Sequence, residues 1–239
     1  CDQQLPDDVN KNWRDATTWT KRDPLAIDLD GDGIETVALS PTAPITFDHN
    51  ADGTKTGTGW LKGDDAWLVL DRDSNGAIDS GRELFGVDTE ITVNGTTRNA
   101  TNGFEALTTL DANGDKVFDA KDAAFAQVRL WQDLNQDGIS QAGELTTLAS
   151  KSITAISLNY TSVNTNLGNG NTVSGTATVT RGGASSEIDS VVIGGDTTAS
   201  NLNLADNPFY REFTDPIVTT SAAQTLPNMR GAGRSEEHT

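Results

Sequence analysis

Five short acidic loops recur between Asp28 and Glu144, and their spacing limits what this chain can fold into. The most complete loop has side-chain oxygens at positions 1, 3 and 5, a glycine at position 6 and a glutamate at position 12: Asp133, Asn135, Asp137, Gly138 and Glu144. Ca²⁺ takes about six to eight oxygen ligands in flexible geometry, and this spacing supplies them, including both oxygens of the closing glutamate. Glycine at position 6 permits the sharp turn that the loop needs. The loop therefore predicts a calcium site.

A second loop lies immediately upstream and turns one site into a repeat. Its predicted ligands are Asp111, Asn113, Asp115 and the closing Asp122, and the ends of the two loops recur every eleven residues. Between the loops, the apolar residues of 120–131 have helical spacing. Further helices are expected over 103–110, leading into the first loop, and over 143–150, leaving the second. We therefore expect a paired EF-hand-like unit that shares its middle helix.

The upstream loop departs from the calcium pattern at two places. Lys116 replaces the glycine of position 6, and the shorter Asp122 replaces the closing glutamate. This loop is expected to bind calcium more weakly, and a metal-free turn is the alternative.

Three earlier loops are less complete. Their predicted ligands are Asp28, Asp30 and Asp32 in the first, Asp48, Asn50 and Asp52 in the second, and Asp71, Asp73, Asn75, Asp79 and Glu83 in the third. The first lacks an acid at position 12, although Glu35 is near. The second has only half of the pattern, which Asp64 and Asp65 could complete from a distance. In the third, Glu83 stands one residue late. Each is predicted to bind calcium, and each could instead be an ordinary turn, because Asp, Asn and Gly favour turns.

The charge of the chain agrees with a dependence on cations. The sequence has 17 basic and 35 acidic residues, which gives a formal net charge of −18. Such self-repulsion opposes a compact state unless cations neutralise it. Nucleic acid is not expected as a partner, because a phosphate backbone needs a basic stripe and the sequence has none. No apolar run approaches membrane-spanning length, so no membrane span is expected.

The remaining sequence predicts strands. Residues 24–39 predict two strands around the first acidic loop, and 60–70 contain another. After Ser150, β-branched runs at 153–158, 172–180 and 187–193 predict a small antiparallel sheet. No regular structure is expected from Thr197 onward. The predicted fold class is α+β: a paired EF-hand-like helix–loop–helix unit, acidic strand–loop–strand segments and a small antiparallel sheet.

The expected organisation has four parts. Residues 1–22 are a linker or the end of a preceding segment, and residues 23–150 form a calcium-binding core. Residues 151–230 form a β-rich part of the same module, and 231–239 are a truncated end that reads like a sequencing-adapter tail. The chain starts without Met, so a piece of a longer protein is expected.

The bond between Asp23 and Pro24 has unusual chemistry. An aspartyl side chain can fold back onto its own carbonyl and close a five-membered anhydride, which expels the nitrogen of the next residue. Proline is the better leaving group, because its nitrogen is tertiary, more basic and easily protonated. A fold that holds the carboxylate in attack geometry gains several orders of magnitude from orientation. Chemistry alone does not separate this pair from a second one, Asp215-Pro216.

The run DPLAIDLDGDGIET, residues 23–36, resembles the start of the self-processing module of FrpC-like RTX proteins. The resemblance continues through FDHNADG (47–53), GAIDSGRELFG (76–86), NGFEAL (102–107), residues 130–145 and LPNMRG (226–231). It covers nearly all of residues 23–231.

This resemblance implies a function. In that family calcium triggers cleavage of the Asp-Pro bond at the start of the module, and a lysine amine can capture the anhydride as an Asp–Lys isopeptide. Carried over by position, Asp23 is the nucleophile and Pro24 the leaving group. The loop residues implied to organise the reaction are Asp111, Asp122, Asp133 and Glu144.

We therefore interpret the chain as a calcium module that cleaves itself once, rather than a turnover enzyme, and that is secreted or lies at a bacterial cell surface. Calcium is its expected cofactor, and a lysine of another protein is a candidate partner. One alternative is a calcium-dependent folding module whose Asp23-Pro24 bond stays intact. Another is an adhesive β-domain in residues 151–230.

Overall fold

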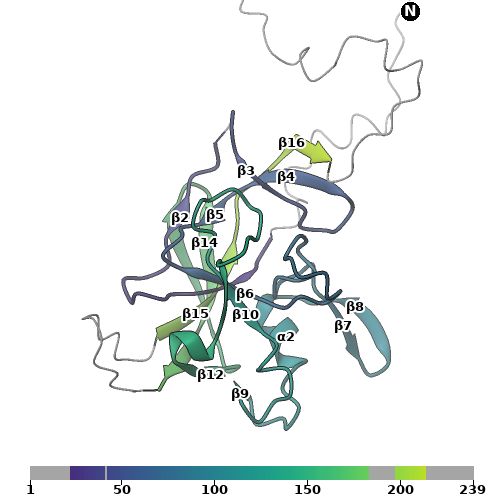
Figure 1. Ribbon diagram of the computed structural model, residues 1–239, viewed down its shortest axis with the longest axis vertical. Coiled ribbons are helices and arrows are strands. Elements are labelled where there is room, and N and C mark those ends of the chain that lie inside the picture. Colours follow the sequence, from purple (N-terminus) through teal and green to yellow (C-terminus); the bar gives the residue numbers. More distant parts are fainter. Residues whose placement is uncertain (1–21, 41, 183–196, 214–239) are drawn as a thin grey trace, which may run out of the picture.

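The computed structural model describes residues 22–40, 42–182 and 197–213, and over these residues the chain is almost entirely β (Figure 1). Its helical elements there are α2 (Gly103–Thr108) and a 3₁₀ turn, η1 (Ala149–Lys151). The described strands are β1 (Leu25–Ile27), β2 (Thr36–Val37), β3 (Ile45–Phe47), β4 (Thr54–Thr58), β5 (Trp60–Leu61), β6 (Ala66–Val69), β7 (Glu90–Val93), β8 (Thr96–Asn99), β9 (Val117–Asp119), β10 (Arg129–Trp131), β11 (Leu145–Thr147), β12 (Ile153–Ser157), β13 (Thr161–Gly168), β14 (Asn171–Arg181), β15 (Thr197–Asn203) and β16 (Asp206–Phe213).

Most of these strands form one antiparallel sheet. Its order is β11-β10-β6-β1-β15-β14-β12-β9, and β13 pairs with β14 in addition. In this sheet β1 lies between two strands from distant parts of the chain, with Ala26 opposite Trp67 of β6 and Leu25 opposite Asn201 of β15. Three smaller sheets pair β16-β4-β3, β2-β5 and β7-β8. The segment around residue 201 in β15 is therefore beside the start of β1.

Apolar side chains cover both faces of this sheet. Successive side chains of a strand point to opposite faces, so Leu25 and Ile27 belong to one buried cluster and Ala26 to another. The second cluster contains four aromatic side chains whose contacting rings lie 5.2–5.9 Å apart between centroids: Phe47, Trp60, Trp67 and Trp131. Burial on both faces explains why 25–27 is a continuous apolar run rather than an alternating one.

The predicted α+β class with a paired EF-hand-like unit is wrong. Residues 120–127 form short turns instead of a middle helix, with hydrogen bonds from Asp122 N to Asp119 O and from Phe125 N to Asp122 O, both 2.9 Å. Residues 129–131 are strand β10. Leu130 and Trp131 belong to different clusters on opposite faces of the sheet. Neighbouring side chains of a strand point in opposite directions in this way, whereas a helix with a single buried face would direct its apolar side chains into one cluster.

The helix expected over 143–150 is also wrong, because Leu145–Thr147 pairs with β10 as β11 and only η1 follows. Two consecutive threonines favour this strand, since β-branched side chains suit a pleated sheet. The helix expected within 103–110 is present as α2. Asn102 caps its amino end and accepts a hydrogen bond from Glu105 N at 2.9 Å.

Several strand predictions are confirmed, in 24–39 (β1 and β2), 60–70 (β5 and β6), 153–158 (β12) and 172–180 (β14). The run 187–193 lies outside the described residues. The expectation of no regular structure after Thr197 is wrong, because β15 and β16 form there. The small polar residues of β15 hide its place between β1 and β14, where the neighbouring strands bury Ala199, Ser200 and Asn201.

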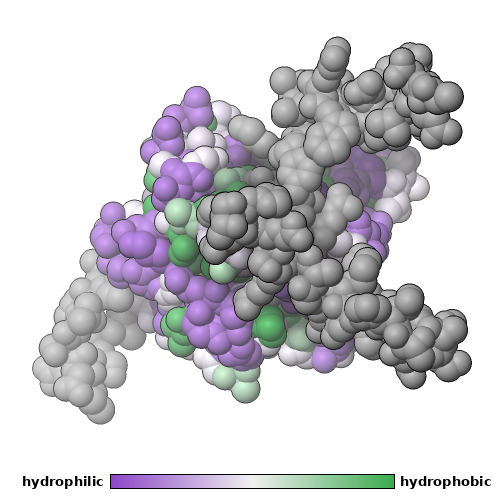
Figure 2. All heavy atoms as spheres, turned by 90° about the horizontal axis from the view of Figure 1, so that it is seen from above, coloured by the Kyte–Doolittle hydropathy of each residue, from purple (hydrophilic) through white to green (hydrophobic). Residues whose placement is uncertain are grey.

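The described surface in Figure 2 is mostly hydrophilic, with small apolar areas between the polar side chains. In the part of the chain that the structure describes, no helix has the length and apolarity needed to cross a membrane.

Candidate functional site

The Asp23–Pro24 bond lies in the interior, directly before β1. The Asp23 side chain is only 6% exposed. Its Oδ1 accepts a hydrogen bond of 2.6 Å from Val87 N, and its Oδ2 accepts one of 3.2 Å from Asn201 Nδ2. Both oxygens of the predicted nucleophile are therefore held, one by the segment after Glu83 and one by β15.

The backbone on the other side of the bond is also fixed. Leu25 N donates to Phe85 O at 2.9 Å, and Leu202 N donates to Pro24 O at 3.0 Å. Gly86 lies against the bond itself, since a Cβ atom there would be 3.3 Å from the carbonyl carbon of Asp23. The bond is thus enclosed between β15 and the 84–88 segment.

The electrostatic environment keeps the Asp23 carboxyl group close to half-ionised at neutral pH. Burial raises its pKa from 3.8 to about 7, the hydrogen bonds from Val87 and Asn201 act in the opposite direction, and the nearby charge of Asp88 raises it further. Asp88 in turn forms an ion pair of 2.6 Å with Arg22 Nη1. The carboxylate required for attack is therefore available near pH 7.

His49 lines the same narrow cleft as Asp23 and Pro24. Its ring is buried, and Nε2 lies 3.1 Å from Thr58 Oγ1. Burial, together with the charge of Arg22, lowers the pKa of His49 to about 3, so the imidazole is neutral. Gly81 is packed so closely on the His49 backbone that a Cβ atom would overlap the His49 carbonyl oxygen.

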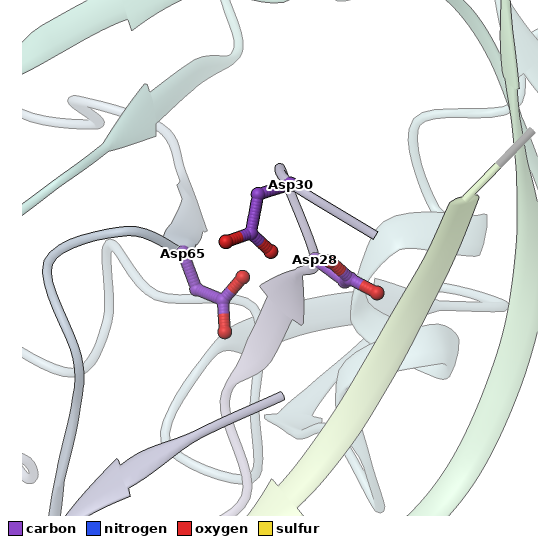
Figure 3. Close-up of side chains that lie close together, drawn as sticks. All are labelled: Asp28, Asp30 and Asp65. Carbon is purple, nitrogen blue, oxygen red and sulfur yellow. The ribbon is translucent and has the colours of Figure 1, made fainter. Parts of the chain in front are cut away.

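Two groups of carboxylates bring oxygens together within 4.8 Å. The first consists of Asp28, Asp30 and Asp65, which lie close together in Figure 3 with the carboxylates of Asp30 and Asp65 facing each other. Asp65 comes from the turn before β6, so it lies with the first loop and not with the Asp48 loop. Its two oxygens accept hydrogen bonds from Leu29 N (3.1 Å) and Glu35 N (3.2 Å). Burial raises the pKa of Asp65 to about 7, and the charges of Asp28 and Asp64 contribute.

The second group consists of Asp71, Asp73 and Glu83. The extra residue before Glu83 therefore does not prevent it from reaching the loop. Glu83 is buried, and its oxygens accept hydrogen bonds from Arg72 N (3.3 Å) and Asp79 N (2.9 Å). Burial raises its pKa to about 7, with further contributions from the charges of Asp79 and Asp73. Both groups offer only oxygen donors, which is the donor set that a hard cation such as Ca²⁺ prefers.

The Asp133 loop has its first and last acids buried and tied to the aromatic cluster. Trp60 Nε1 donates to Asp133 Oδ2 at 2.7 Å, and Trp131 Nε1 donates to Glu144 Oε2 at 3.3 Å. Asp133 also accepts from Gly138 N at 2.8 Å. Two independent features require glycine at position 138. Its φ is 71°, and a Cβ atom there would lie 2.6 Å from Thr46 O. Asn135 Nδ2 donates to Asp137 Oδ2 at 2.9 Å.

The two remaining loops show the same turn geometry. In the Asp111 loop, Asp111 accepts from Gly114 N and Lys116 N at 2.8 and 2.9 Å, and Lys116 takes a left-handed φ of 63°. Asp122 closes the loop by accepting from Ala112 N at 2.8 Å. The Lys121 ammonium lies 3.1 Å from Asp115 and 2.9 Å from Asp119 and lowers the pKa of both.

In the Asp48 loop, Asp48 is buried and accepts hydrogen bonds from Asp52 N (3.2 Å) and Gly53 N (2.8 Å). Asn50 Nδ2 donates to Asp52 Oδ2 at 2.9 Å. The predicted ligands of this loop, like those of the Asp111 and Asp133 loops, form the hydrogen bonds of Asx-type turns.

Sequence reasoning missed the groups that hold Asp23. Val87 and Asn201 are 64 and 178 residues away from it, and a backbone N–H carries no sequence signal. For Asn201 the available signal was the alternation that ends in Leu202 and Leu204, which indicates a strand. The second Asp-Pro pair, at 215–216, lies outside the described residues.

A family model described as "SPM domain" matches residues 25–194, so the chain belongs to the SPM domain family. The chain is also similar to "Iron-regulated protein FrpA" of Neisseria meningitidis serogroup C, with 45% identity over 216 residues. Those residues are 89% of this chain but 18% of FrpA, so the chain spans less than a fifth of that relative. The family assignment and this relative confirm the resemblance to an FrpC-like module at the level of the module.

Proposed function

We propose that this chain is a calcium-triggered self-processing module that breaks its own Asp23–Pro24 bond and acts once. The observation that carries the proposal is the Asp23 carboxylate. It is buried directly before the proline, both of its oxygens are held, and its pKa is about 7. A buried carboxylate with this pKa and fixed geometry is more typical of a reacting group than of a turn.

The proposed reaction needs only the residues of the bond. An Asp23 carboxylate oxygen attacks the Asp23 carbonyl carbon and forms a C–O bond in a five-membered cyclic anhydride. The C–N bond to Pro24 breaks, and the proline nitrogen takes up a proton as it leaves. Water then opens the anhydride and leaves Asp23 with two carboxyl groups. If a lysine amine of another protein opens it instead, an Asp–Lys isopeptide forms.

Calcium at the loops would neutralise carboxylate repulsion and fix the loop backbones, and the chain connects two loops directly to the bond. Asp28 follows the last residue of β1, so the first loop anchors the strand that begins directly after Pro24. Glu83 lies four residues before Val87, so the third loop anchors the segment that donates to Asp23. Ordering these loops would therefore place both sides of the reacting group.

The Asp133 and Asp48 loops contact this unit. Ile78 N of the third loop donates to Ser140 Oγ of the Asp133 loop at 2.7 Å. Asp48 of the second loop forms a bridge with Ser80, and Gly81 N donates to Asp48 O at 2.9 Å. These contacts support a cooperative response of the loops to calcium, with the predicted ligand residues acting together.

The proposal extends to the place of action and to the extent of the module. Calcium sites of extracellular modules bind at about 10⁻⁴ to 10⁻³ M, so the loops would stay empty in a low-calcium cytosol and the module would act after secretion or at a bacterial surface. The pairing of β1 with β15 supports the proposal that residues 23–150 and the β-rich residues 151–230 form one module.

The test is incubation of the purified chain with millimolar calcium or with chelator, followed by intact-mass spectrometry. The expected result is calcium-dependent release of a fragment whose new amino terminus is Pro24. Asp23→Asn and Asp23→Ala should abolish the break, because neither forms the anhydride under these conditions. Asp215→Ala is the matched control and should cleave like wild type. An intact chain after prolonged incubation with calcium, with folding confirmed, would leave the calcium-dependent folding role in its place.

A further inference from the structure

Asn201 is a buried side chain next to Asp23. It is 3% exposed and lies in β15 opposite Leu25. Its Nδ2 donates to Asp23 Oδ2 at 3.2 Å and to Ser174 Oγ at 2.8 Å, and its Oδ1 accepts from Gly103 N at 2.8 Å. Every polar atom of the side chain therefore has a partner.

The network fixes which way the Asn201 amide points. A backbone N–H can only donate, so the atom that faces Gly103 N must be the amide oxygen. The amide NH₂ group then has to face Asp23 and Ser174. Two structural elements distant in sequence, α2 and β14, thus hold one side chain so that its N–H points at the carboxylate.

We propose that Asn201 is a positioning residue for the self-processing reaction: with Val87 N, it orients the Asp23 carboxylate toward the Asp23 carbonyl carbon. This inference rests on the proposed function. Val87 N holds Oδ1 and Asn201 holds Oδ2, so rotation of the carboxylate about its Cβ–Cγ bond breaks at least one hydrogen bond. The family match ends at residue 194, and β15 therefore adds a contribution to the site from beyond the matched segment.

The charged and titratable groups around Asp23 also influence how its ionisation depends on pH. Asp88 and Arg22 face it as an ion pair of 2.6 Å, and His49 lines the same cleft as a neutral ring. None of these groups contacts the Asn201 side chain through a hydrogen bond that the described residues show. The described hydrogen bonds of the Asn201 side chain go to Asp23, Ser174 and Gly103, so a change at Asn201 reaches Asp23 directly.

The experiment compares cleavage rates of the full chain at saturating calcium across pH, with Asn201→Asp and Asn201→Ala against wild type. Asn201→Asp is isosteric and keeps the acceptor for Gly103 N, but it replaces the donor to Asp23 with a second carboxylate. We expect a rate loss at pH 7 on the order of 10- to 100-fold, because small misplacements of a reacting group cost about this much. The acid limb of the pH–rate profile should also move to higher pH, since a like charge and a lost donor both favour protonated Asp23.

Asn203→Asp and Asn203→Ala are the matched controls, because Asn203 lies in the same strand and its Nδ2 donates to Thr172 Oγ1 at 3.2 Å instead of to Asp23; both should cleave within a few-fold of wild type. Calcium-dependent melting checks that each variant folds. If Asn201→Asp does not fold, Asn201→Ala decides, since it removes the donor without adding charge. A variant that cleaves like wild type, or whose rate falls without movement of the acid limb, overturns the positioning role. Wild type that folds with calcium and stays intact overturns the proposed function itself, and the inference with it.

Discussion

Replacing Gly86 with alanine tests whether the reaction takes place where Asp23 is enclosed. A Cβ atom at Gly86 would lie 3.2 Å from Asp23 Oδ1 and 3.3 Å from both the carbonyl carbon and the carbonyl oxygen of Asp23. Ordinary contacts of a Cβ atom begin at 3.4 Å, so Asp23 must shift by a few tenths of an ångström. All three crowded atoms belong to the residue that would react in the proposed cleavage.

The magnitude follows from this displacement. A misplacement of about 1 Å costs roughly 100-fold in rate, so a shift of a few tenths should slow cleavage by roughly 3- to 10-fold. Overpacking of a filled interior also lowers the free energy of unfolding by about 1 kcal/mol or somewhat more.

Two quantities are measured. The first is the single-turnover cleavage rate at saturating calcium, and the second is the free energy of unfolding of the chelated protein in urea. Gly182→Ala is the matched control, because its Cβ atom would lie 3.1 Å from Thr154 Cγ2, in a similarly tight contact remote from Asp23. It should keep the wild-type rate, and it should lose less stability than Gly86→Ala, because Gly182 and Thr154 are both exposed and the Thr154 side chain can move. Equal rates for the two variants would refute the assignment of the enclosed Asp23 as the reacting group.

Three further predictions concern calcium and pH. The Tm of the chain should rise with calcium concentration, because ligand that binds only the folded state adds its binding free energy; identical melting curves in chelator and in excess calcium would contradict this. Glu144→Gln should raise the calcium midpoint, followed by Trp fluorescence, more than Asp52→Asn, because Glu144 closes the most complete loop and contacts Trp131; the reverse order would show that the ranking is wrong. In chelator, wild type should lose stability relative to Asp23→Asn as pH rises. The pKa of Asp23 is about 7 in the folded state and 3.8 as its ordinary value, so the folded state binds the Asp23 proton more tightly than the unfolded state. The stabilisation of the fold by protonated Asp23 is therefore fully present below about pH 4 and is lost as the pH rises through about 7. Urea unfolding at pH 4.5 and 7.5 should show a change on the order of a few kcal/mol, and a constant difference would argue against the buried site.

The sequence predicted local features well where the residues that form a feature are close together in the chain. The Asp71 loop illustrates this, because its spacing anticipated that Glu83 reaches Asp71 and Asp73 despite the extra residue. Turn residues and ligands are both set by neighbours in the chain, so their positions can be predicted without knowledge of the fold.

The middle helix shows where this reasoning fails. Apolar residues in 120–131 have helical spacing, but Leu130 and Trp131 are adjacent and enter opposite clusters. The spacing of apolar residues does not show in which of the two buried clusters each side chain lies. Pairing of β10 with β6 and β11, which depends on distant segments, therefore overrode the local pattern.

The groups around Asp23 could not be predicted for a related reason. Val87 contributes a backbone N–H, which every residue except proline has. Asn201 comes from a strand of small polar residues that is recognisable only when its neighbours β1 and β14 are in place. A pattern within one segment contains no information about such contacts.

The place of Pro24 immediately before β1 determines which contacts would remain after a break at its bond to Asp23. The strand after the bond keeps its partners on both sides, β6 and β15, so the carboxyl-terminal product retains its central strand. On the other side of the bond, the described contacts of Arg22 are the bridge to Leu204 and the ion pair with Asp88. A break at this bond would therefore create a new amino end, Pro24, beside a strand that stays paired, while the hydrogen bonds from Val87 and Asn201 would still hold the new carboxyl end at Asp23.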